Sequence, residues 1–204
     1  MNEYKYKLNF YIYPFYVFFF LFSFYGCSSR QNIMCAYVPQ ETKSNKYPEL
    51  TQYTDCARIN DKEEIIINDD HLDKIWFDDS GLAEIRIHDG VYYLNNQGKI
   101  TKSYFYDNGA DPFREGLSRT KKNNKFGFID KKLNVVIQPK YDFVYPFSNG
   151  ISKICIGCKK VKAGEHTEIQ NGKWGGIDKS GNVVIDISHK YEDIEKIIIK
   201  NKEQ

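Results

Sequence analysis

The sequence has almost no excess of charge of either sign. Its 29 Lys and Arg residues and 27 Asp and Glu residues leave a formal net charge of +2, and the two signs are interleaved along most of the chain. A nucleic-acid-binding protein usually carries a basic patch or stripe, and the sequence contains no such stripe. The composition therefore predicts that nucleic acid is not a partner.

The sequence also lacks a metal motif and a catalytic constellation. The four histidines are His71, His88, His166 and His189, and no two of them have helical or zinc-finger spacing. The acidic pairs Asp69-Asp70 and Asp78-Asp79 lack the alternating loop, the Gly and the terminal Glu of an EF-hand. We therefore expect no metal, no cofactor and no enzymatic activity.

A long uninterrupted apolar run is missing as well. Lys5 and Lys7 precede an apolar, aromatic segment whose cleanest part, Tyr11 to Phe22, is shorter than the roughly 17 to 25 residues that span a bilayer. A basic end, an apolar middle and a small residue at the exit are typical of a secretory signal. Residues 1–26 are therefore predicted to direct export, and an uncleaved membrane anchor is the alternative.

The end of this segment contains a candidate lipidation site. Gly26-Cys27 resembles the lipobox of bacterial lipoproteins, in which the Cys is acylated and becomes the mature N-terminus, although Phe24 and Tyr25 replace the usual Leu and small residue. The resemblance implies a lipoprotein of the bacterial cell envelope, anchored to the membrane through Cys27 and facing the periplasm or the cell surface.

Four cysteines remain if Cys27 carries lipid. They are Cys35, Cys56, Cys155 and Cys158. In an exported chain an even number of cysteines favours disulfides over metal binding, but the spacings leave the connectivity open.

The next segment, residues 27–60, is polar. It contains Pro39 and Pro48 and shows no sustained hydrophobic period. This pattern predicts a linker or a loosely packed cap, with ordered structure beginning at Ile65.

The rest of the chain contains an internal repeat. Phe77, Phe113 and Phe147 lie roughly 35 residues apart, and each is followed by a Gly and an apolar residue. We divide residues 61–200 into a partial copy and three further copies. The divisions are 65–76, 77–112, 113–146 and 147–199.

Within a copy, the pattern predicts strand, turn and strand. Alternating residues at 83–87 and the β-branched run at 183–185 are typical of strands. Asp178-Lys179-Ser180-Gly181 suits a type I turn closed by a left-handed Gly. Asp130 and Asp178 invite an acid-base interpretation, but their place before tight turns favours turn capping. The predicted fold is all-β, with tandem antiparallel three-stranded repeats.

The recurring phrase Lys173-Trp174-Gly175-Gly176-Ile177-Asp178 resembles the WG-repeat family, also called KWG repeats. Its units carry an aromatic-Gly pair, then Ile-Asp, a Gly turn and an apolar strand. The residues that match this signature are Phe126, Gly127, Asp130, Trp174, Gly175, Asp178 and Gly181. The ring would fill the core, and the Gly would let a neighbouring backbone come close. The resemblance implies a β-structural module of bacterial exported proteins, with no agreed activity.

The last copy contains an insertion at 155–172. Gly150 and Trp174 are separated by fourteen more residues than their equivalents, and the extra chain carries Lys159, Lys160, Lys162 and His166. Insertions in repeat arrays map to surface loops that often bind partners. A lengthened hairpin turning at Ala163-Gly164, with no partner, is the alternative.

The insertion begins with Cys155-Ile156-Gly157-Cys158. This spacing allows a redox dithiol, a structural disulfide or two small core residues. Its strand-like context favours the structural interpretations. We therefore expect a binding or interaction module for an unknown envelope protein or polymer. The alternatives are a thiol-disulfide redox protein and a passive envelope component.

Overall fold

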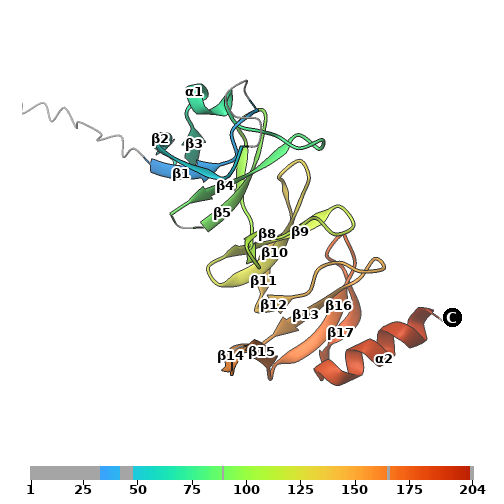
Figure 1. The fold of residues 1–204 in the computed structure, drawn as a ribbon. Coiled ribbons are helices and arrows are strands. Elements are labelled where there is room, and N and C mark those ends of the chain that lie inside the picture. The colour runs from blue at the N-terminus through green and yellow to red at the C-terminus, as the bar shows by residue number, and fades with distance from the viewer. Residues whose placement is uncertain (1–32, 42–47, 89, 165, 203–204) are drawn as a thin grey trace, which may run out of the picture.

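The computed structural model describes residues 33–41, 48–88, 90–164 and 166–202, which are mostly β-structure (Figure 1). In chain order the elements are β1 (Ile33–Tyr37), β2 (Thr51–Ile59), β3 (Ile65–Ile67), α1 (Asp69–Leu72), β4 (Leu82–Ile87), β5 (Gly90–Asn95), β6 (Ile100–Lys102), β7 (Phe105–Tyr106), β8 (Gly109–Ala110), β9 (Leu117–Lys122), β10 (Lys125–Asp130), β11 (Val135–Tyr141), β12 (Phe143–Val144), β13 (Ser152–Ile156), β14 (Lys159–Ala163), β15 (His166–Gln170), β16 (Lys173–Ile177), β17 (Val183–His189) and α2 (Tyr191–Lys202). The predicted all-β class is confirmed.

The strands form four three-stranded antiparallel meanders in the described part of the chain. They are β1-β2-β3, β4-β5-β6, β9-β10-β11 and β13-β16-β17. Figure 1 shows them following one another from the blue end of the chain to the red end. Each meander is too thin to bury its own apolar face, so the array is stable because neighbouring units cover one another.

The first two meanders share one sheet, and the later ones form sheets of their own. The shared sheet has the order β3-β2-β1-β4-β5-β6, and its two halves join where Cys35 of β1 pairs with Ile87 of β4. The third meander is the sheet β11-β10-β9, whereas the fourth gains β12 at its edge. The array therefore changes from a fused pair of units to separate, stacked units.

The expected linker at 27–60 and the partial copy at 65–76 need correction. β1 and β2 lie in the supposed linker and complete the first meander with β3, while 69–72 form the short helix α1. The buried residues that hold these strands are Cys35, Tyr37, Cys56 and Ala57. Only two of the nine residues of β2 are buried, so its sequence shows no hydrophobic period, and pairing with β1 and β3 makes it a strand.

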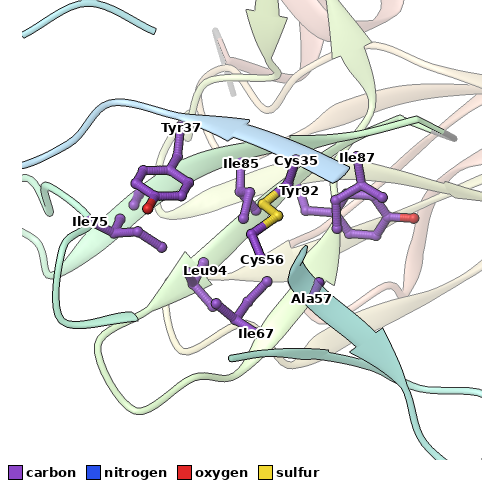
Figure 2. Close-up of a cluster of buried hydrophobic side chains, with 11 residues drawn as sticks. Cys35, Tyr37, Cys56, Ala57, Ile67, Ile75, Ile85, Ile87, Tyr92 and Leu94 are labelled. Carbon is purple, nitrogen blue, oxygen red and sulfur yellow. A yellow bond between two sulfur atoms is a disulfide. The ribbon is translucent and has the colours of Figure 1, made fainter. Parts of the chain in front are cut away.

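A disulfide between Cys35 and Cys56 lies in the core of this first sheet. Figure 2 shows it among the side chains of Ile85, Tyr92 and Leu94, which come from β4 and β5. The two cysteines are separated by 21 positions in the sequence. A disulfide restricts the unfolded chain more strongly when the loop that it closes is longer. The bridge therefore links β1 to β2 covalently.

Apolar side chains also join the successive units. A small cluster of Leu82, Ile129 and Leu133 links the second meander to the third. A larger cluster links the third to the fourth. It contains Leu117, Phe126, Phe128, Ile137, Tyr141, Val144, Phe147, Ile154 and Ile177. Contacts of this kind, between neighbours along the chain, are typical of repeat arrays.

The end of the predicted last copy also needs correction, because residues 191–202 form the helix α2 instead of β-structure. Ile194, Ile197 and Ile198 are spaced at three to four residues, and they pack against the cluster that contains Trp174. Glu192 and Asp193 lie in the first turn, where acidic side chains favour a helix. The helix covers the otherwise open end of the array.

Candidate functional site

The signature aromatic residues fill the core between units. Phe126 on β10 is 4% exposed and Trp174 on β16 is 2% exposed. The Phe126 ring centroid lies 5.5 Å from that of Phe143, which in turn lies 6.4 Å from Trp174. Aromatic rings at these separations and edge-to-face angles attract one another. The two signature rings thus belong to one aromatic row that runs across the third and fourth meanders.

The signature glycines allow the third strand of each later meander to cross close to the second. A Cβ on Gly127 would meet the backbone of Ile137 and would lie 2.7 Å from the nitrogen of Pro139. A Cβ on Gly175 would lie 2.6 Å from the carbonyl oxygen of Ile185. The ladders on both glycines are irregular, with register shifts between Phe126 and Phe128 and between Trp174 and Gly176. These positions therefore need Gly because a backbone occupies the space of a side chain.

The first and second meanders lack Gly at these positions, and their third strands are short. Their equivalent positions hold Ala57 and Tyr92, and the third strands β3 and β6 are three residues long with regular registers. In contrast, β11 and β17 are seven residues long. The aromatic-Gly pair therefore goes with a long, bulged third strand, and its absence goes with a short, regular one.

Asp130 and Asp178 cap the turns between the second and third strands. Oδ1 of Asp178 accepts the backbone N–H groups of Ser180 and Asn182 at 2.9 Å, and Gly181 has a φ of 86°. Hydrogen bonds from the side chain and backbone of Asn182 lower the pKa of Asp178. Burial raises the pKa of Asp130, but hydrogen bonds from its own turn outweigh this effect and lower it. The lowered pKa values keep both carboxylates ionised, and both side chains cap their turns.

The same turn occurs at three more positions. Asn60, Asp78 and Asn95 each accept backbone N–H groups from the second and fourth residues after them. The turn at Asn60 joins β2 to β3, and the turn at Asp78 precedes β4. The sequence interpretation identified neither of these two. An Asn or Asp five residues before a strand, repeated at 60, 95 and 130, was the signal that could have located the first meander.

The insertion forms a separate hairpin. β14 and β15 pair antiparallel from Lys159 opposite Gln170 to Ala163 opposite His166, in a sheet of their own. The side chains of Lys159, Lys160, Lys162 and His166 are all exposed. Figure 1 shows the hairpin beside β13 at the lower edge of the last meander. The insertion is therefore a hairpin, and Lys159, Lys160 and Lys162 lie on one of its strands.

Cys155 and Cys158 form a disulfide at the base of this hairpin. Cys155 is fully buried and Cys158 is 9% exposed, and both belong to the cluster around Trp174. Ile169 of β15 packs against the same cluster. The bridge therefore attaches the base of the hairpin to the core. Cys155 lies on β13 and Cys158 in the connection to β14, so neither cysteine opens a helix.

A hollow of about 270 Å³ lies where the hairpin meets the third meander. Its lining includes Tyr104, Phe126 and Phe143, which continue the aromatic row, and Lys121, Lys159 and Lys160 at its edge. The sequence interpretation did not find this hollow because its lysines come from strands almost forty residues apart. It is the candidate binding site.

Comparison with protein families identifies the repeat. The model described as a WG containing repeat matches residues 93–126 and 126–159, which contain Phe126-Gly127. The chain therefore contains two adjacent WG repeats between residues 93 and 159. No curated protein matches it, and no solved structure does so.

The matched WG repeats end at Lys159, the first residue of β14. The last meander, with Trp174 and Gly175, and the first meander, with β1 and β2, therefore lie outside the matched residues. Their assignment to the repeat array rests on the strand topology and on the shared turn at Asn60 and Asp178.

The WG-repeat array also contains a buried ion pair that the sequence interpretation missed. The guanidinium of Arg119 donates from Nη2 to Oδ1 of Asp111 at 2.5 Å, and the two side chains are 4% and 1% exposed. The backbone N–H of Arg119 donates to Oδ2 of Asp111, and Nη1 of Arg119 donates to the carbonyl of Val144. The pair thus connects the segment after β8 with β9 of the third meander and with β12.

Several predicted residues take no part in the candidate site. Cys27 lies outside the described residues. His71 accepts or donates a hydrogen bond with the Tyr37 hydroxyl at 2.9 Å inside the first sheet. Within the described ranges, no group of three or more His, Cys, Asp or Glu side chains could hold a metal ion. No helix there is long and apolar enough to cross a membrane.

Proposed function

We propose that this WG-repeat protein is an exported, lipid-anchored binding module of the bacterial cell envelope, and that the β14–β15 hairpin is its contact surface. The proposal rests on the difference in length between two equivalent strand connections. β9 and β10 are joined by the two residues Asn123 and Asn124, whereas β13 and β16 are joined by residues 157–172. Ordering the additional chain costs conformational entropy, and the β core does not need it.

The charge of the hairpin supports an anionic partner. Lys159, Lys160 and Lys162 lie on β14, and the neighbouring strand carries Glu168 opposite the uncharged Val161. Exposed lysines on one strand give a local positive potential in a chain whose net charge is only +2. An anionic polymer of the envelope fits this edge better than a neutral surface does.

The redox alternative has less support. Attack on a disulfide requires access to one of its sulfurs, and here Cys155 is fully buried while Cys158 is 9% exposed. A passive structural role explains the stacked meanders, but it does not explain a hairpin that is absent from the β9–β10 connection. Binding without catalysis accounts for both features.

The proposed export and lipid anchoring can be tested at the N-terminus. If residues 1–26 are a lipoprotein signal, mass spectrometry of the protein from the membrane fraction of its own cell should find a mature chain that begins at an acylated Cys27. The expected result follows from the Gly26-Cys27 sequence at the end of the apolar segment. Recovery of an intact Met1, or of a mature chain beginning elsewhere, would contradict lipidation.

The proposed contact surface can be tested by removing the hairpin. Deleting Lys159 to Gly172 leaves Gly157 and Cys158 as the connection between β13 and β16, the same length as Asn123-Asn124. We expect this variant to remain folded and to lose at least tenfold in binding to the envelope fraction, measured by co-sedimentation of the full chain.

A charge variant makes this test independent of folding. Lys159→Glu, Lys160→Glu and Lys162→Glu alter exposed side chains of β14 and leave the strand pairing intact. Reversing the charge of three exposed lysines on α2 and its flank, Lys190, Lys196 and Lys200, is the matched control. Full-strength binding by the β14 variant, or an equal loss in the control, would overturn the proposed contact surface.

A further inference from the structure

Two hollows adjoin each other on the face that the hairpin borders. The first, of about 270 Å³, lies between β10 and the start of β14, and the second, of about 330 Å³, lies beside β5 and β6. Tyr104, Lys121 and Asn124 line both of them. The two hollows therefore adjoin at these three residues, and together they are here called the Lys121 groove.

The Lys121 groove has a positive charge that is not neutralised. Lys121, Lys159 and Lys160 line it, and none of the ion pairs in the described part of the chain involves them. The carboxylate among the described lining residues is that of Asp142. Its Oδ1 pairs with Nζ of Lys125 at 2.5 Å, and its Oδ2 accepts the N–H of Gly157 at 2.7 Å. The carboxylate of Asp142 is therefore already paired with other groups of the protein.

Aromatic rings form the floor of the groove. The ring centroids of Tyr104 and Phe126 are 4.9 Å apart, and Nζ of Lys121 lies 5.1 Å from the Phe126 centroid. The guanidinium carbon of Arg119 lies 4.9 Å from the Tyr104 centroid, and Arg119 is itself held by Asp111. The half-buried Tyr104 ring is therefore fixed before any ligand arrives, which reduces the entropy lost on binding.

We propose that the Lys121 groove binds an acidic polysaccharide, with ring faces against Tyr104 and carboxylates on Lys121, Lys159 and Lys160. This inference rests on the proposed function and names its ligand and its site. Sugar rings present C–H groups that pack on aromatic faces, while Asn124 supplies an amide for hydroxyl groups. A few separated ammonium groups match a polymer that carries one charge every sugar or two.

The alternative polyanion, single-stranded nucleic acid, fits less well. Nucleic acids carry a charge on every nucleotide, and proteins that bind them use a positively charged groove that tracks the backbone and stack bases on aromatic rings. Here Phe126 is only 4% exposed, and no Arg lines the groove among the described residues. Lysine acts as a point charge, which suits an isolated carboxylate.

The test measures binding of the full chain to defined probes by fluorescence anisotropy. The probes are an oligogalacturonate, its neutral methyl-esterified counterpart and an oligothymidylate of similar length. Lys121→Gln combined with Lys160→Gln removes two charges from the groove, and Lys196→Gln combined with Lys200→Gln removes two charges from α2 as the control. We expect the groove variant to bind oligogalacturonate at least tenfold more weakly than the parent and the control.

Each outcome has a defined meaning. Weaker binding by the groove variant, with a shallower dependence on salt and little affinity for the neutral probe, supports the proposal. It is overturned if the parent does not bind oligogalacturonate, if oligothymidylate binds more tightly, or if the groove variant binds as the parent does. Lys121 lies outside the hairpin, so an unaffected Lys121→Gln variant together with a hairpin variant that loses envelope binding would reject the groove and keep the proposed function.

Discussion

Replacing Asp111 by Asn is expected to lower the free energy of unfolding by about 3–5 kcal/mol, because the buried guanidinium of Arg119 would lose its counter-charge. Arg119 is 4% exposed in its side chain, so water cannot solvate the orphaned charge. The loss should appear as a reduced denaturation midpoint in urea with little change in slope. The effect is large because both side chains are almost completely buried.

A second substitution separates this mechanism from a general loss of packing. Adding Arg119→Met to Asp111→Asn removes the uncompensated charge, so the double variant should be more stable than Asp111→Asn alone. As a control, Glu115→Gln removes the exposed ion pair with Lys179, which spans 3.1 Å, and should cost less than about 1 kcal/mol. A double variant that is no more stable than the single one would show that charge burial is not the cause.

Gly175→Ala is expected to destabilise the protein by about 3 kcal/mol, because the added Cβ would overlap with the backbone of β17. The atoms that it would meet are the carbonyl oxygens of Ile185 and Asp186, at 2.6 and 2.9 Å. Backbone atoms of a paired strand cannot rotate away as a side chain can. Thermal unfolding followed by circular dichroism measures the loss.

The neighbouring Gly176 provides a matched control on the same strand. A Cβ there would meet the side-chain carbons of Ile151 and Ile185 at 3.1 Å, and these atoms can shift. Gly176→Ala should therefore cost clearly less than Gly175→Ala. Equal losses at both positions would mean that strand propensity, and not the close approach of β17, explains the signature glycine.

Much of the array could be predicted from the sequence, since its signals are local. The turn at Asp178 to Asn182 needs an acceptor side chain and a residue at positive φ, and both are visible in the letters. The spacing of Phe113 and Phe147 also located the third and fourth meanders. The insertion was visible as a change in that spacing, and the structure places it in one hairpin.

Other features depend on contacts that no local pattern encodes. β2 is a strand because β1 and β3 pair with it, and its exposed residues show no period. Arg119 and Asp111 form a buried ion pair, although the sequence alone would place both charged residues on the surface. The helix α2 is different, because the spacing of Ile194, Ile197 and Ile198 was present in the sequence but was included in the last β copy.

Hydrogen exchange of the full chain, with and without the envelope fraction of its own cell, tests most directly whether the protein binds through its inserted hairpin. Exchange slows where a ligand covers or stabilises hydrogen-bonded backbone. The account predicts slower exchange in residues 159–170 of β14 and β15 and in the Lys121 to Lys125 turn, with β1 to β3 unchanged. Slower exchange confined to the first sheet, or no change anywhere in the hairpin while the chain is bound, would contradict it.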